Sequence, residues 1–348
     1  MAYTTIKKPS DYFNTKLYTG NGSTQSITGV GFQPDFTWIK SRSSGSWHHM
    51  GDVLRGADKR LQTNSTNAES TATTGITSWD SDGFSLGDNG DTNSNTNNFA
   101  SWNWLAGGTG VSNTDGSITS TVSANTTSGF SIVSYTSTGS NATVGHSLGE
   151  APAMIIFKRR SGDTENWVVY HKSLGATKNI KLNLTDAVST SSTRFNDTEP
   201  TSSVFSLGTS GDTNGGTSPF IAYCFAEKTG YSKFGSYTGN GNADGTFVYT
   251  GFKPAFVIIK RTDSLGQWNM FDIARADVPN ANGNDQVIYS NSSDAELSST
   301  TREIDLLSNG FKCKATGGDI NASGGSYIYM AFAEAPLVGS NDVTAKAR

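Results

Sequence analysis

The sequence predicts an all-β fold built from three similar units in tandem. Three observations lead to this prediction: the composition, an internal repeat, and short apolar runs bounded by turn residues. Gly, Ser, Thr and Asn are abundant in the 348 residues, whereas charged residues make up only 16%. Strong helix formers dominate no long window. This composition is typical of many short strands joined by polar turns.

The internal repeat consists of seven landmarks that occur three times in the same order. They include a Tyr-Thr-Gly-Asn-Gly turn, an apolar run ending in lysine, a tryptophan, an Asn-x-[Ser/Thr]-[Asn/Asp]-Ala segment, a Gly-Asp-x-Asn turn and an aromatic closing strand. Representative positions are Tyr18, Tyr135 and Tyr237; Lys40, Lys158 and Lys260; Trp47, Trp167 and Trp268; Asn64, Asn183 and Asn291; and Asp91, Asp212 and Asp319. We therefore interpret the chain as three diverged copies of one module.

Each copy spans about a hundred residues, the usual size of one β-sandwich. We expect homologous sandwiches of the jelly-roll or lectin-like type. The runs before Lys40 and Lys260 are entered through a proline, as at the start of a strand. The closing run 327–332 is continuously apolar, which indicates a strand covered on both faces.

The repeat also predicts where the units begin and end. Because the second connection is short, we expect the units to pack together, with a pseudo-threefold arrangement as the further expectation. The predicted divisions are an N-terminal arm 1–11, a first unit 12–108, a linker 109–128, a second unit 129–228, a third unit 229–340 and a C-terminal tail 341–348.

Charge and hydropathy argue against several classes of protein. The net charge is −4 and no basic stripe with interleaved aromatics is present, so we expect no nucleic-acid partner. No apolar stretch approaches the ~20 residues that span a bilayer, and the first residues lack the apolar core of a signal peptide. We expect synthesis in the cytoplasm and no membrane insertion. Cys224 and Cys313 are interpreted as buried free thiols rather than a disulfide.

The repeated tryptophans are candidate glycan-binding or interface residues. Trp47, Trp167 and Trp268 follow the lysine-bearing strand in every copy, and exposed aromatic rings stack on sugars in many binding modules. A core tryptophan required by each sandwich is the alternative. The adjacent His48 and His49 occur only in the first copy and extend the candidate site, with a surface loop as the alternative.

A group of carboxylates in the first copy is a candidate calcium site. Hard oxygen ligands at short spacing suit calcium, although the EF-hand pattern is absent. A repeated turn cap is the favoured alternative, and no other cofactor is expected. The candidate ligands are Asp80, Asp82, Asp88 and Asp91.

We expect no enzymatic activity. Glu227 and Glu334 end the closing strand in two copies, but Ala106 takes that place in the first. Glycoside hydrolysis normally requires two carboxylates, and no second one recurs at a matching place. A glycan depolymerase is therefore the least favoured hypothesis.

The stretch Gly-Phe-x-Pro-x-Phe-x-x-Ile-Lys, the Asn-x-[Ser/Thr]-[Asn/Asp]-Ala segment and the closing run 331–336 resemble a recurrent module of marine bacteriophage structural proteins. That module looks like a β-sandwich and occurs in tail, fibre and other virion proteins, known mainly as a domain of unknown function. The resemblance covers nearly the whole chain. The middle copy departs from it, with Leu148 and Met154 in place of the two aromatics. No catalytic residue is implied.

The resemblance implies a virion part of a phage that infects cyanobacteria or other marine bacteria. We expect a surface appendage or decoration, such as a head decoration, a knob or a tail-attached part, that aids adhesion to host glycans. A receptor-binding tail fibre or lectin-type glycan-binding protein is the alternative. The expected partners are other capsid or tail proteins and a host surface glycan, and a homotrimer is the preferred oligomer.

Overall fold

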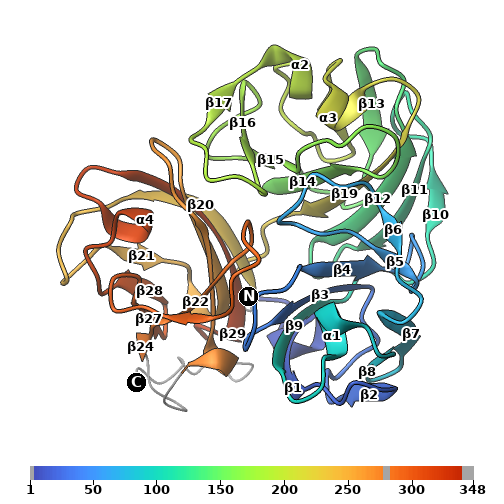
Figure 1. Ribbon diagram of the computed structural model, residues 1–348. Coiled ribbons are helices and arrows are strands. Elements are labelled where there is room, and N and C mark those ends of the chain that lie inside the picture. The colour runs from blue at the N-terminus through green and yellow to red at the C-terminus, as the bar shows by residue number, and fades with distance from the viewer. Residues whose placement is uncertain (1–3, 277–282, 339–348) are drawn as a thin grey trace.

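The computed structural model describes residues 4–276 and 283–338, and its regular structure is nearly all β-strand (Figure 1). The prediction of an all-β chain is confirmed. The predicted tail 341–348 lies outside the described residues. None of the helices in the described part of the chain is long and apolar enough to cross a membrane.

Three lobes surround a common centre in Figure 1. Lobe 1 holds a larger sheet of order β1-β9-β3-β4, a smaller sheet of order β2-β8-β7 and the pair β5-β6. Its elements, after a 3-10 turn η1 (Pro9–Asp11), are β1 (Phe13–Thr19), β2 (Gln25–Thr28), β3 (Phe36–Ser41), β4 (His49–Asp52), β5 (Lys59–Arg60), β6 (Ser70–Thr71), β7 (Ile76–Asp80), β8 (Gly83–Leu86), α1 (Gly90–Asn93) and β9 (Asn98–Trp104).

Lobe 2 holds a larger sheet of order β10-β11-β12-β19-β14-β15-β16-β17 and a smaller pair, β13-β18. Strands β10 and β11 come from the predicted linker 109–128 and extend this sheet as a hairpin. The elements are β10 (Val111–Asn113), β11 (Ser120–Asn125), β12 (Phe130–Thr136), β13 (Ala142–Gly145), β14 (Met154–Arg159), β15 (Val168–His171), β16 (Lys178–Lys181), β17 (Ser189–Thr190), α2 (Ser192–Phe195), β18 (Val204–Leu207), α3 (Gly211–Asn214) and β19 (Pro219–Phe225).

Lobe 3 holds a larger sheet of order β20-β29-β22-β23-β25-β26 and a smaller sheet of order β21-β28-β27-β24. The elements are β20 (Ser232–Thr238), β21 (Phe247–Tyr249), β22 (Phe252–Arg261), β23 (Trp268–Asp272), η2 (Ile273–Arg275), β24 (Gly283–Asn284), β25 (Gln286–Tyr289), β26 (Leu297–Ser298), β27 (Ile304–Leu307), β28 (Gly310–Cys313), α4 (Gly318–Asn321) and β29 (Ser326–Pro336).

The same strand order recurs at the centre of every larger sheet. The opening strand of the lobe pairs with its closing strand, which pairs with the lysine-bearing strand and then with the strand that follows: β1-β9-β3-β4, β12-β19-β14-β15 and β20-β29-β22-β23. The register agrees as well. The opposed pairs are Tyr18 and Phe99, Tyr135 and Phe220, and Tyr237 and Tyr327.

The lysine-bearing and closing strands at the centre of each larger sheet are buried on both faces. In β14, Ile155 and Phe157 belong to the core of lobe 2 alone, whereas Met154 and Ile156 belong to a central cluster shared by all three lobes. Strand β29 alternates in the same way between the core of lobe 3 and the central cluster. The continuous apolar run 327–332 is therefore covered on both faces, as predicted.

Three aromatic rings from the three closing strands meet in the central cluster. Trp104 lies 6.3 Å from Phe225 and 5.7 Å from Phe332 between ring centroids, and Phe225 and Phe332 are 5.9 Å apart. These residues stand opposite the lysine-bearing strand at the same register position in each lobe. Large aromatic side chains bury more apolar area than any others, so this triangle stabilises the association of the lobes.

The repeated turns hold each lobe together locally. The Tyr18 hydroxyl donates to the Thr92 carbonyl at 2.6 Å, and the Asn93 side chain donates to the Gly87 carbonyl at 2.8 Å. In lobe 2, Tyr135 donates to the Thr213 carbonyl and Asn214 to the Gly208 carbonyl. In lobe 3, Tyr237 donates to the Ile320 carbonyl and Asn321 to the Ala315 carbonyl. The asparagine of Gly-Asp-x-Asn is thus a buried structural residue in all three lobes.

The predicted N-terminal arm takes part in the fold. Ile6 is 1% exposed and belongs to the central cluster. Cys224 and Cys313 are buried and free, as predicted.

Candidate functional site

The three lobes meet at three junctions that share one main-chain hydrogen bond. At each junction a backbone N–H five residues after the repeated asparagine donates to the carbonyl two residues after the repeated lysine of another lobe. The pairs are Glu69 to Arg160 at 2.9 Å, Val188 to Thr262 at 2.9 Å, and Glu296 to Arg42 at 3.0 Å. Lobe 1 therefore contacts lobe 2, lobe 2 contacts lobe 3, and lobe 3 contacts lobe 1.

A buried ring N–H crosses each junction as well. Trp167 Nε1 donates to the Gln62 carbonyl and Trp268 Nε1 donates to the Lys181 carbonyl, both at 2.9 Å. In lobe 1 the corresponding ring is His48, whose Nε2 lies 3.0 Å from the Tyr289 carbonyl. All three acceptors lie two residues before the repeated asparagine.

The protonation state of His48 follows from its contacts. Its Nδ1 accepts from Trp38 Nε1 at 2.8 Å, so the proton of the neutral ring is on Nε2, which donates to the Tyr289 carbonyl. Burial, followed by the charge of Lys40, lowers the pKa of His48 to about 3. A neutral histidine thus performs the tryptophan's role at this junction.

The repeated lysines are buried beside the junctions. Lys158 Nζ donates to the Thr66 and Glu165 carbonyls at 2.9 and 2.7 Å, and Lys260 Nζ donates to the Thr185 and Gly266 carbonyls at 3.0 and 2.9 Å. Lys40 donates to carbonyls of its own lobe. Burial lowers the pKa of each of the three ammonium groups to about 8. These lysines bind backbone oxygen atoms of the protein and act as structural cations.

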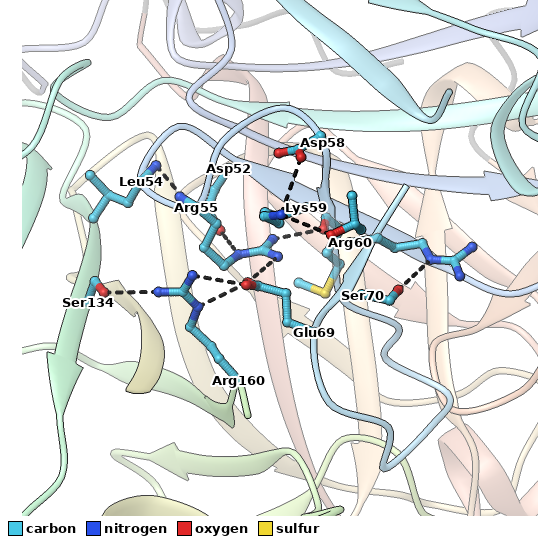
Figure 2. A network of polar contacts seen from close by, with 12 residues as sticks. Asp52, Leu54, Arg55, Asp58, Lys59, Arg60, Glu69, Ser70, Ser134 and Arg160 are labelled. Atoms are coloured by element: carbon cyan, nitrogen blue, oxygen red, sulfur yellow. Dashed lines mark hydrogen bonds and ion pairs between the residues drawn. The ribbon is translucent and has the colours of Figure 1, made fainter. Parts of the chain in front are cut away.

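The junction of lobes 1 and 2 is filled by charged side chains (Figure 2). Arg160 donates two hydrogen bonds to Glu69, at 2.9 and 3.0 Å, and Arg55 reaches the same carboxylate at 3.3 Å. Arg55 is also bound at 2.5 Å by Asp52, which accepts from the Tyr223 hydroxyl at 2.8 Å. Burial alone would lower the pKa of Arg55, but the carboxylates, led by Asp52, raise it above its ordinary value.

The junction of lobes 3 and 1 repeats this network. Arg42 donates to Glu296 at 2.6 and 2.9 Å, and Arg275 donates to the other oxygen of that carboxylate at 2.8 Å. Asp272 binds Arg275 at 2.5 Å and accepts from Trp102 Nε1 at 2.9 Å. The two junctions therefore share an Arg–Glu–Arg arrangement with a buried aspartate behind it.

The junction of lobes 2 and 3 lacks these charges. The strand registers place His171 where the other junctions have Asp52 and Asp272. Leu174 stands at the place of the first arginine, Val188 at that of the glutamate and Thr262 at that of the second arginine. All three residues line a hollow of about 500 Å³ between the two lobes.

The hollow is the candidate functional site. Its lining is rich in hydroxyl groups and includes one cation, Lys178, and one anion, Asp263. Lys178 and Ser173 from lobe 2 are exposed, as are Ser236 and Ser326 from lobe 3. The complete lining is Ser173, Leu174, Lys178, Val188, Ser236, Tyr237, Thr238, Thr262, Asp263, Ser326, Tyr327 and Ile328.

The structure separates the three predicted tryptophans. Trp167 and Trp268 are 0% and 2% exposed, so neither is available to stack on a glycan, whereas Trp47 is 43% exposed. The alignment of Trp47 with the other two is wrong by one residue. The backbone N–H groups that bind Asn64, Asn183 and Asn291 belong to His48, Trp167 and Trp268.

His49 is buried behind the junction rather than in a surface loop. Both of its ring nitrogens are buried without a partner in the described structure, and burial, followed by Arg60 and Arg55, lowers its pKa to about 3. Both His48 and His49 are therefore interior residues, and the prediction of a surface loop is wrong. His48 itself is an interface residue between lobes.

The four predicted calcium ligands have separate surroundings. Asp80 accepts from the hydroxyls of two serines, Asp82 accepts from the backbone N–H groups of Gly29 and Gly31, and Asp88 is exposed. Asp91 binds Arg60 at 2.7 Å and accepts from the Trp47 backbone N–H at 3.2 Å. In the described ranges, no group of three or more His, Cys, Asp or Glu side chains could hold a metal ion.

The two glutamates considered for catalysis each bind lysine. Glu227 accepts from Lys172 and from Lys233, and these bonds hold the pKa of its carboxyl below its ordinary value although burial raises it. Glu334 binds Lys253 at 2.6 Å. Neither carboxylate lines the hollow.

Sequence reasoning missed the hollow and the charged junctions. The signal was present in the repeat, because Arg42 and Arg160 occupy one position and Glu69 and Glu296 another. Thr262 stands at the arginine position of the remaining copy and Val188 at the glutamate position, so neither charge is repeated three times.

The fold and the junctions define a three-lobed all-β protein whose lobes share one core. A family model described as a domain of unknown function (DUF7483) matches residues 8–336, so the chain belongs to that family. No curated protein and no solved structure matches the chain.

Proposed function

We propose that the chain is a non-catalytic structural protein of a bacteriophage virion, exposed on the particle as a head decoration, knob or tail-attached appendage. The observation that carries this proposal is the closed series of junctions around a shared core. One face of every larger sheet packs into the central cluster that the three lobes share. Such an arrangement suits a part that must keep its shape.

We also propose that the three lobes are homologous modules of the jelly-roll or lectin-like type in a pseudo-threefold arrangement. The recurring strand order, the common register and the matching junction bonds support this. A single chain then presents three related faces, which suits a threefold or quasi-threefold position on a particle. A homotrimer of such chains is the proposed oligomer, and sedimentation of the purified chain distinguishes it from a monomer.

The absence of catalysis is part of the proposal. The engagement of Glu227 by two lysines supports it. The histidines support it too, since His48, His49 and His171 are at most 1% exposed and their rings are inaccessible to a substrate. The proposal invokes no cofactor.

Mass spectrometry of purified particles, followed by antibody-gold labelling, tests the virion assignment. We expect the chain in the particle, with gold spread over the head for a decoration. Gold confined to the tail would move receptor binding to first place. A particle free of the chain would overturn the proposal.

A further inference from the structure

The junction of lobes 2 and 3 differs from the other two by the loss of two arginines and a glutamate. Leu174, Val188 and Thr262 are all smaller than the residues they stand in for, and the space between the lobes remains open. A volume of about 500 Å³ lies within the range of roughly 300–1,000 Å³ that small-molecule sites occupy. We propose that this hollow binds a neutral carbohydrate, as one or two sugar units of a larger glycan.

The charge of the lining favours a neutral ligand. Lys178 and Asp263 are its two charged residues, and they offset each other. Asp263 is already bound by Arg261 at 2.9 Å, so its carboxylate offers no surplus negative charge for a cation. A phosphate or sulfate would require a surplus of positive groups, which the lining does not supply.

The polar groups of the lining suit a ligand with many hydroxyls. The side-chain hydroxyls of Ser173, Ser236 and Ser326 bond to no other residue in the described part of the chain. A serine hydroxyl both donates and accepts, as a sugar hydroxyl does, so the two can pair in either direction. The Lys178 ammonium adds three donors and likewise has no partner within the described ranges.

The apolar groups complete the match to a sugar ring. Leu174 and Val188 contribute carbon surface to the same hollow. A pyranose has faces made of C–H groups, which are buried favourably against such side chains, while its hydroxyls point outward to polar partners.

Saturation-transfer NMR with glucose, galactose, mannose, N-acetylglucosamine, maltose and cellobiose tests the proposal on the full chain. We expect at least one sugar to receive saturation from the protein. The double variant Val188→Glu/Thr262→Arg restores the charged pair of the other junctions and fills the hollow. We expect it to weaken binding of that sugar by about tenfold or more.

Two control variants make the result specific. Trp47→Ala and Ser112→Tyr alter exposed residues outside the hollow, and both should bind the sugar as the unmodified chain does. Should the double variant fail to unfold cooperatively on heating, Ser236→Tyr replaces it, because that exposed strand residue projects a larger side chain at the same site.

The proposal is overturned if none of the six sugars receives saturation. It is also overturned if a sugar binds the filled variant as well as the unmodified chain, or if Trp47→Ala alone abolishes binding. The inference is independent of the virion assignment, since a chain absent from particles can still bind the sugar, and a virion protein can fail to.

Discussion

The junction between lobes 1 and 2 and the junction between lobes 2 and 3 use the same backbone but different side chains. Both have the hydrogen bond from the fifth residue after the repeated asparagine, at 2.9 Å. In the first, Arg160 and Glu69 are 19% and 13% exposed and fill the interface. In the second, Thr262 and Val188 leave a hollow. Backbone and buried rings therefore suffice to position the lobes, and the outer side chains are free to differ.

The junction of lobes 3 and 1 shows what the charged version adds. It closes the series with residues 254 positions apart in the chain, Arg42 and Glu296. The pair is partly exposed at 24% and 8%, but Arg275 behind it is fully buried. Two of the three junctions thus contain a buried arginine–carboxylate network whose loss should be costly, and the third does not.

The largest effect is expected from Asp52→Ala, which breaks the charged junction of lobes 1 and 2. The variant leaves the buried Arg55 with the more distant Glu69 as its carboxylate partner, and the Tyr223 hydroxyl loses its acceptor. Removing one partner of a buried pair costs about 3–5 kcal/mol, so the urea midpoint should fall strongly. Asp58→Ala, whose side chain is 47% exposed, is the control and should change stability by less than about 0.5 kcal/mol. Equal midpoints would contradict the role given to the junction.

Trp167→Phe tests the hydrogen bond from a buried ring N–H that all three junctions share. The variant removes the N–H that donates to the Gln62 carbonyl and leaves that oxygen buried. The free energy of unfolding should fall by about 1–3 kcal/mol. Trp47→Phe should be neutral within about 0.5 kcal/mol, because this ring is 43% exposed. Parallel urea titrations compare the two, and a larger loss for Trp47→Phe would refute the assignment of the interface residue.

The buried His49 predicts a contribution from lobe 1 to the pH dependence of stability. Burial lowers the pKa of His49 to about 3, so the unfolded chain binds a proton that the folded chain does not between about pH 6.5 and 3. Stability therefore falls as the pH falls through that window. His49→Asn, which introduces the residue of lobe 3, should reduce the slope by up to about 1.4 kcal/mol per pH unit. Urea midpoints measured across the window check this, and an unchanged slope would mean that His49 is charged when folded.

The smallest effect concerns the pair Glu69 and Arg160. A double-mutant cycle with Glu69→Val and Arg160→Thr converts this junction to the side chains of the third one. A coupling free energy of about 1 kcal/mol is expected for a partly buried, doubly hydrogen-bonded pair. The pair Lys253 and Glu334, in which the glutamate is 42% exposed, provides the matched cycle and should give less than about 0.5 kcal/mol. Comparable couplings would remove the distinction between the junctions.

The features that could be predicted from the sequence are those with a local cause. The alternation of burial in β29 follows from a strand period of two. The Gly-Asp-x-Asn segment, predicted as a turn, forms a four-residue helix in each lobe, and its aspartate binds an arginine instead of its own backbone. The exposed Trp47 was misaligned because an aromatic ring adjoined the true position, which histidine occupies in lobe 1. Histidine and tryptophan share a ring N–H donor, and a comparison by size or hydrophobicity misses that likeness.

The candidate site had no such local cause. Arg42 and Glu296 meet because two lobes are oriented by a shared core, which no strand or turn pattern encodes. The hollow is defined by what the third junction lacks. Only an alignment of the three copies in correct register would show Val188 at the place of Glu69 and Thr262 at the place of Arg160.

The bond from His48 to the Tyr289 carbonyl has a consequence for biosynthesis. Translation proceeds from the N-terminus, and lobe 1 can begin to fold long before residues 289–296 are made. Until they emerge from the ribosome, the Nε2 proton of His48 and the guanidinium of Arg42 lack their acceptors in lobe 3. The first lobe therefore completes its hydrogen bonds only after the last lobe has been synthesised. A chain that terminates before residue 289 leaves the polar groups of His48 and Arg42 without these partners.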